Sequence, residues 1–263
     1  MRPPAAGITR ERSVDAWIDL NRTIQALLRR GRFVLVTDDA VGSREEESLQ
    51  HVTTNLGQGA DLSRVIPFLT LKHGLDYCLL FARRAASHGL GALTITGGDL
   101  AVGLPRCVPR SRTLRKLLRE QAPGLPLGAW VNPHRKPEEQ VELLLDPEHE
   151  ADYFLTQVVS HHDLSAVDRF LNEAARRGLT TPGLFGVFFY RSANPHTLEK
   201  LGRFMPVPRD ALEKEFGGGA TPEEVCARTL EALARRGVPK VYVSNLAVRG
   251  ADERLQAIES LIR

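Results

Sequence analysis

The chain has 263 residues, of which 42% are hydrophobic and 25% are charged, as is usual for a globular protein. This length suffices for one α/β barrel or for two small domains. The formal net charge at pH 7 is only +3, so we expect no nucleic-acid partner.

Targeting signals and metal-binding cysteine motifs are absent from the sequence. No apolar run approaches the ~18–20 consecutive residues of a membrane span, so we expect no membrane association. Residues 1–12 lack the apolar core of a secretory signal, which makes the cytoplasm the expected location. The three cysteines are widely spaced and form no Cys-x-x-Cys pair, so neither a disulfide framework nor a zinc knuckle is predicted.

Short apolar runs rich in β-branched and aromatic residues recur along the chain, and the gaps between them are typical of helices. The seven runs are Phe33–Thr37, Val65–Thr70, Ala92–Thr96, Leu127–Val131, Asp152–Val158, Leu184–Tyr190 and Lys240–Leu246. This alternation predicts an α/β fold, a TIM-type (βα)8 barrel that is incomplete or seven-stranded at its N-terminus. Only Ala5–Thr9 is available for an eighth strand, within a lead over residues 1–12 that we expect to be disordered.

Capping and stop signals delimit several of the helices. Ser13 predicts the start of a helix that runs through Arg30. The acidic residues Glu45–Glu47 suit the first turn of another helix. A further helix is predicted over Gly74 to Ser87, before glycines that stop it.

The C-terminal third contains the longest irregular stretch, residues 205–223. It predicts a mobile loop or a short inserted helix near the mouth of a barrel. The sequence from Thr221 is a strong helix start, and Gly237 is a strong stop. Too little chain follows for a second core, so we predict a single domain over residues 13–263.

Polar residues and glycines stand where several predicted strands end, which is where (βα) barrels collect their chemistry. Gly97-Gly98-Asp99 would let a ligand approach the backbone and offer it a carboxylate, although an ordinary Gly-Asp turn is the alternative. Gln157 can donate a hydrogen bond to an amide-like ring and accept one from it. Alternatively, it is a structural amide. No Gly-x-Gly-x-x-Gly or Walker loop is present.

Histidines raise two further possibilities. His134 follows a strand that contains Trp130 and is placed to meet a cofactor, unless it is a surface loop residue. His161 and His162 suggest a metal, but we expect adjacent side chains in a strand-to-helix loop to diverge. Because no carboxylate or cysteine ligand accompanies them, we predict no metal site. The dense basic segment Arg106–Arg119 either faces a phosphate or forms a solvated helix face.

Taken in order, the strand ends resemble those of the methylenetetrahydrofolate reductase family over roughly residues 14–263. The segments that carry the resemblance are VLVTDDAVGS at 34–43, FLTL at 68–71, LTITGGD at 93–99, FLTQ at 154–157, PGLFGV at 182–187 and GVPKV at 237–241. The family folds as a (βα)8 barrel and passes hydride from NAD(P)H, usually through FAD, to a methylene-folate. The resemblance therefore implies a one-carbon oxidoreductase.

The same resemblance implies roles for particular residues. Asp99 would lie near the flavin and the pterin, Gln157 would bind the pterin, and Thr37 would approach the flavin ring. Asp99 and Gln157 are thus the candidate catalytic and substrate-binding residues. The candidate cofactor-binding residues are Thr37, Gly98, Asp99, Trp130 and His134. A homo-oligomer or a partner subunit is also compatible with the sequence.

The sequence departs from the family at four positions. The glutamate of the first strand, the proposed proton donor, is missing, and Glu11 is poorly placed to replace it. Phe68 stands where the family has histidine, Gly97 where it has arginine, and Asp146 near a lysine that meets the flavin phosphate. These losses should weaken FAD binding. A non-catalytic folate-binding subunit and a methyl or methylene transferase of the same fold therefore remain alternatives.

Overall fold

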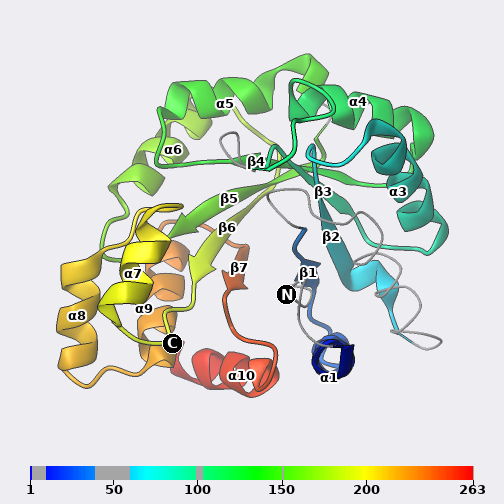
Figure 1. Ribbon diagram of the computed structural model, residues 1–263. Helices are drawn as coiled ribbons and strands as arrows, with labels where there is room; N and C mark the ends of the chain where they lie inside the picture. Colours follow the sequence, from blue (N-terminus) through cyan, green and yellow to red (C-terminus); the bar gives the residue numbers. More distant parts are fainter. Residues whose placement is uncertain (2–9, 39–59, 99–102, 150, 263) are drawn as a thin grey trace. The chain divides into compact units, whose positions relative to one another are not determined.

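The structure is a computed structural model that describes residue 1 and residues 10–38, 60–98, 103–149 and 151–262. Strands alternate with helices along this part of the chain (Figure 1). The strands follow one another in chain order, and the pairs with a defined register are parallel. The protein is therefore an α/β protein with the strand order of a TIM-type barrel, and seven strands lie among the described residues.

The chain divides into two compact units, each of which is described by itself. The first unit comprises Met1–Trp130 and Pro147–Tyr153, and the second comprises Val131–Asp146 and Phe154–Arg263. The expectation of one domain over residues 13–263 remains a prediction.

The first unit contains most of the first four strands and the helices between them. Its elements are α1 (Arg10–Arg29), β1 (Val34–Val36), η1 (Leu62–Arg64), β2 (Val65–Thr70), α3 (Leu75–Ser87), β3 (Leu93–Thr96), α4 (Ser111–Gln121), β4 (Leu127–Val131) and η2 (Pro147–His149). Helices α3 and α4 pack side by side, and α4 lies against β3. The buried side chains of β2 and β3, such as Leu69 and Ile95, form the core beneath these helices.

The second unit contains the last three strands and their helices. Its elements are α5 (Pro137–Leu145), β5 (Tyr153–Val159), α6 (Ser165–Arg176), β6 (Gly183–Phe188), α7 (Pro195–Gly202), α8 (Arg209–Gly217), α9 (Pro222–Ala234), β7 (Val241–Ser244) and α10 (Ala251–Leu261). Helices α5 and α6 pack together, α9 lies against β6, and α10 packs on α9. Phe170 of α6 contacts Phe154 of β5 and Phe185 of β6 edge to face, which fixes α6 on this sheet.

All seven predicted strands are present. Two of them, Val65–Thr70 and Leu127–Val131, have the predicted bounds, and the others differ by one or two residues at an end. The helix start at Thr221 is also confirmed, because its hydroxyl accepts from Glu224 N while Glu224 accepts from Thr221 N. Gly237 ends that segment with a φ of 73°, a left-handed conformation that favours glycine.

Two expectations about the N-terminal region need comment. Helix α1 begins at Arg10 rather than at Ser13, so residues 10–12 are helical and not part of a disordered lead. The candidate strand Ala5–Thr9 and the acidic segment Glu45–Glu47 lie outside the described residues.

Met1 pairs with the edge of β1 that faces away from β2. The Met1 amino group donates to Leu35 O, and the Met1 carbonyl accepts from Thr37 N at 2.8 Å. Met1 therefore donates to the residue before Val36 and accepts from the residue after it, which is the hydrogen-bond pattern of parallel strands. The outer edge of β1 thus forms hydrogen bonds with Met1 like those it would form with a neighbouring parallel strand.

The stretch over residues 205–223 contains a short helix, the second of its two expected forms. Helix α8 is held by Leu212, which is fully buried in an apolar cluster with Tyr190, Leu198 and Val225. Residues of α7, α8 and α9 thereby share one core. The cluster fixes α8 firmly enough to position the polar side chains that follow Leu212.

Gly91 of the first unit lies close to the backbone of a neighbouring segment. A Cβ at this position would lie 1.9 Å from Ser63 O, whereas nothing lies within 4 Å of a Cβ at Gly124. We therefore expect Gly91→Ala to lower the free energy of unfolding by about 1–3 kcal/mol, through overpacking. Gly124→Ala should leave it unchanged or raise it by about 0.4–1 kcal/mol. Urea denaturation measures both, and equal midpoints for the two variants would contradict the close contact.

Candidate functional site

The predicted site residue at the end of β1, Thr37, is engaged with Met1. Its hydroxyl donates to Met1 O at 3.1 Å, in addition to the backbone bond. The side chain is half-buried. Thr37 therefore contributes to the strand edge, and its predicted contact with a flavin stays a prediction.

The two glycines after β3 accommodate a guanidinium group. Arg106 donates from Nη2 to Gly98 O at 3.1 Å, and a Cβ at Gly97 would lie 2.5 Å from the same nitrogen. Gly98 has a φ of 66°, which glycine adopts without strain. Arg106 Nε is buried and completes no hydrogen bond among the described residues. The predicted site residue Asp99 lies outside the described residues.

Trp130 of β4 lies beside an aromatic side chain of β2. Its ring meets that of Phe68 edge to face, with the ring centroids 6.1 Å apart, and both residues are half-buried. Such a pair offers an apolar surface to a planar ring. It offers no charge or strong hydrogen-bond acceptor.

Buried hydrogen bonds to one carboxylate join the ends of β1 and β2. Asp38 Oδ2 accepts from Thr70 N at 2.8 Å and from His73 Nε2 at 2.7 Å, with the Asp38 and His73 side chains 9% and 2% exposed. The His73 ring also packs on Tyr77, with centroids 4.9 Å apart. Asp38 belongs to the segment at 34–43 that carries the family resemblance, but nothing in the sequence indicates its pairing with His73.

In the second unit, two predicted site residues meet at Val158. Val158 N donates to Gln157 Oε1 at 3.0 Å, and His134 Nε2 donates to Val158 O at 3.0 Å. His134 is further held by its backbone N, which donates to Asn132 Oδ1. Gln157 Nε2 makes a long hydrogen bond of 3.4 Å to Phe204 O. The structure thus brings Gln157 and His134 together at the end of β5.

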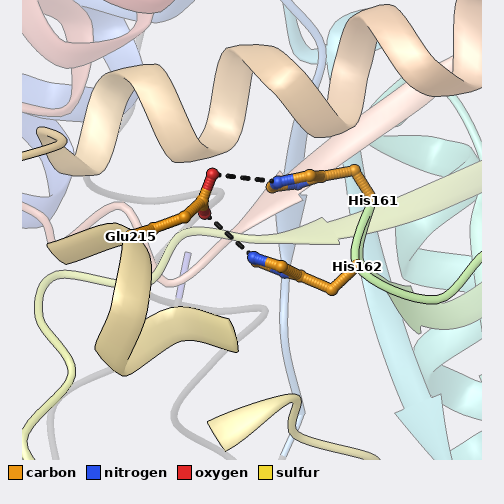
Figure 2. Close-up of side chains that lie close together, drawn as sticks. All are labelled: His161, His162 and Glu215. Atoms are coloured by element: carbon orange, nitrogen blue, oxygen red, sulfur yellow. Dashed lines mark hydrogen bonds and ion pairs between the residues drawn. The ribbon is translucent and has the colours of Figure 1, made fainter. Parts of the chain in front are cut away.

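The expectation that His161 and His162 diverge is wrong. Figure 2 shows both rings directed at Glu215 of α8, with 3.2 Å from His161 Nε2 to Oε1 and 2.9 Å from His162 Nε2 to Oε2. The ring centroids are only 4.0 Å apart. The reason is a tight turn, closed by a bond from Asp163 N to Ser160 O, that points both side chains the same way.

Further polar groups surround this His161–His162–Glu215 cluster. His161 Nδ1 lies 2.8 Å from Thr229 Oγ1, and His162 Nδ1 lies 2.8 Å from Ser160 Oγ. Arg228 of α9 pairs with Glu215 Oε1. The cluster is therefore built from the loop after β5, from α8 and from α9.

The surroundings in the cluster shift the pKa values of His161 and Glu215. Burial lowers the pKa of His161, and the nearby His162 lowers it further, although Glu215 opposes both effects. Burial alone would raise the pKa of Glu215. Arg228 and the two histidines outweigh it and hold that pKa below its ordinary value. Near neutral pH, a neutral His161 ring therefore faces an ionised carboxylate.

Glu215 was not identified as a site residue from the sequence. It lies 54 positions beyond His161, within the stretch expected to be a loop or a short helix. The available signal is the spacing of Leu212 and Glu215, because residues three apart on a helix share a face. If Leu212 is buried, Glu215 lies on the same face of the helix and also points inward.

Comparisons with known proteins do not assign the chain to a family. No family model and no curated protein matches it. One similar solved structure is a Pseudomonas aeruginosa protein assigned as a dihydrodipicolinate synthetase, with 14% identity, a TM-score of 0.43 and coverage of 95% of both chains. Another is a mandelate racemase/muconate lactonizing enzyme-like protein from Rubrobacter xylanophilus, with 16% identity, a TM-score of 0.39 and coverage of 67% of this chain and 44% of that chain. Similarities this low carry no argument about activity. Among the described residues, no helix combines the length and apolar character needed to cross a bilayer.

The Asp38 carboxylate should be important for stability. Asp38→Ala removes the acceptor of two buried donors, Thr70 N and His73 Nε2, and should lower the free energy of unfolding by about 2–4 kcal/mol. Asp38→Asn keeps an oxygen acceptor at the same place and should cost about 1 kcal/mol. Chemical denaturation of both variants measures the difference. If Asp38→Ala were no worse than Asp38→Asn, the bonds to Thr70 and His73 would not be what stabilises these strand ends.

Proposed function

We propose that this chain is a methylenetetrahydrofolate reductase-like oxidoreductase that reduces a methylene-folate with NAD(P)H. The observation that supports the proposal is the position of the polar groups. Thr37, Gly98 and Gln157 each stand at or just beyond the carboxyl end of a parallel strand, which is where enzymes of this strand order carry their active sites. The sequence resemblance supplies the substrate class.

Gln157 is the residue best suited to hold the pterin. Its side chain is half-buried, and among the described residues its Nε2 makes one hydrogen bond, a long one to Phe204 O. A bond of that length is readily exchanged for a shorter one to a ligand. The amide then offers a donor and an acceptor to the pyrimidine edge of a pterin.

The residues present do not fit the FAD that the resemblance implies. Phe68, in place of a histidine, is in apolar contact with Trp130, and Asp146 would bring a negative charge toward the flavin phosphates. Only the lost arginine has a substitute, since Arg106 places its guanidinium against Gly97. A diphosphate would gain too few charge-assisted hydrogen bonds here. In this proposal, hydride passes directly from NAD(P)H to the folate.

The reaction then balances without a flavin. The bond between the methylene carbon and N10 of the folate breaks, its electron pair stays on N10, and N10 takes a proton from solvent. Hydride from C4 of the nicotinamide forms the new C–H bond, so the methylene becomes a methyl group on N5 and the nicotinamide is oxidised. Glu215 does not serve as the proton donor, because its low pKa keeps it ionised. The missing glutamate should cost about 10²–10⁴-fold in rate.

The purified chain should be colourless and should oxidise NADH or NADPH only when methylene-folate is present. Gln157→Ala should lower kcat/KM at least about tenfold through a raised KM, because a hydrogen bond to the bound ring is lost. Gln256→Ala, on the exposed surface of α10, is the matched control and should match the unaltered protein. Absorbance spectra and steady-state kinetics provide both readouts.

Three other results would point elsewhere. Flavin absorbance in the purified protein would contradict direct hydride transfer. Tight folate binding without NAD(P)H oxidation would favour a non-catalytic folate-binding or partner subunit, a candidate that the missing glutamate specifically favours. Methyl transfer to a corrinoid or thiol with no nicotinamide requirement would favour a transferase of the same fold.

A further inference from the structure

We propose that His161, His162 and Glu215 form a binding site for one zinc-type divalent cation. The site lies within the second unit, between the loop after β5 and helix α8 (Figure 2). Two imidazoles and one carboxylate are a ligand set that Zn²⁺ takes in proteins, with a fourth position left open. This inference does not rest on the proposed reductase activity.

The distances between the ligand atoms suit such an ion. One ligand atom from each of the three residues lies within 4.8 Å of the other two. Ligands about 2.0–2.2 Å from a tetrahedral ion are about 3.4 Å from one another. The contacts of 3.2 Å and 2.9 Å between Glu215 and the two histidines are close to that spacing, so small side-chain shifts admit the ion.

An unpartnered pair of buried atoms supports a cation site. His162 Nε2 and Glu215 Oε2 are buried and 2.9 Å apart, yet neither completes a hydrogen bond among the described residues. The His162 side chain is nine-tenths buried, with 10% exposed. Buried polar atoms without partners are rare and costly. A cation bound by both atoms satisfies them together.

The hydroxyl that faces His161 lets its Nε2 act as a ligand. Thr229 Oγ1 lies 3.3 Å from Val225 O and 2.8 Å from His161 Nδ1, so when its hydrogen goes to Val225 O it accepts from Nδ1–H. In a neutral imidazole, a proton on Nδ1 leaves the lone pair on Nε2. In the protein without an ion, Nε2–H donates to Glu215 Oε1 at 3.2 Å, so binding of a cation requires that the ring proton stands on Nδ1 instead. This arrangement of an outer hydrogen bond behind a ligating histidine is typical of metal sites.

Arg228 determines how Glu215 binds the ion. Because Arg228 pairs with Oε1, the carboxylate keeps Oε2 for the cation. The same guanidinium repels a cation and so moderates the affinity. Glu215, Arg228 and Lys214 line an open hollow of about 450 Å³, through which solvent reaches this end of the cluster.

The experiment titrates the full, tag-free chain with ZnCl₂ by calorimetry, after EDTA treatment and dialysis. One equivalent should bind, and CoCl₂ should give the visible absorption of a tetrahedral Co²⁺ site. His162→Gln and Glu215→Gln should each weaken zinc binding by on the order of 100-fold, since each removes a ligand. Circular dichroism melting in EDTA checks that both variants are folded.

Two control variants separate this site from chance binding. Glu213→Gln changes an exposed carboxylate on the same helix, and His196→Gln changes an exposed histidine on α7. Both should bind zinc like the unaltered chain. Equal affinity in all five proteins would mean adventitious binding and overturn the proposal. So would the absence of a stoichiometric site or of the Co²⁺ absorption in the unaltered chain, a result that does not depend on any variant.

Discussion

Parallel pairing of neighbouring strands is the constraint on which both units depend. Two adjacent parallel strands point the same way, so the chain must return along the sheet between them. From β2 onward, each return includes a helix, and that helix buries the apolar face of the strands. In the first unit, the register of Val36 with Pro67 brings the ends of β1 and β2 together, which lets Asp38 reach Thr70 and His73.

This constraint explains why the fold was predictable from the sequence. Strands that are covered on both faces need apolar residues at successive positions, so they stand out as continuous runs such as Val65–Thr70 and Leu127–Val131. Helix starts that depend on local chemistry were equally visible, as the capping box of Thr221 and Glu224 shows. The start of α1 was less visible, because residues 10–12 carry no signal that separates a helix from a lead.

The polar clusters depend on contacts between distant segments and were predicted only in part. The sequence identifies Gln157 and His134 as residues at strand ends, but not their shared partner Val158. Glu215 reaches the two histidines only because Leu212 docks α8 in the core of the second unit. No local pattern encodes that docking. The divergence expected of adjacent histidines is a property of extended chains, and the turn at Ser160 removes it.

The two proposals concern neighbouring parts of the same unit. Gln157 and His161 lie four positions apart near the end of β5. Phe204, which accepts from Gln157, lies between α7 and α8. Glu215, which contacts His161, lies in the last turn of α8. One long hydrogen bond from Gln157 and the contacts of Glu215 with two histidines thus join this end of β5 to the α7–α8 segment. A cation at that carboxylate would replace its contact with His162 by two coordinate bonds. Because the ion binds only where these segments meet, its binding free energy adds to the stability of that arrangement. Gln157 would then be held on a more rigid segment, and rigid support of this kind is what precise orientation of a bound ring requires.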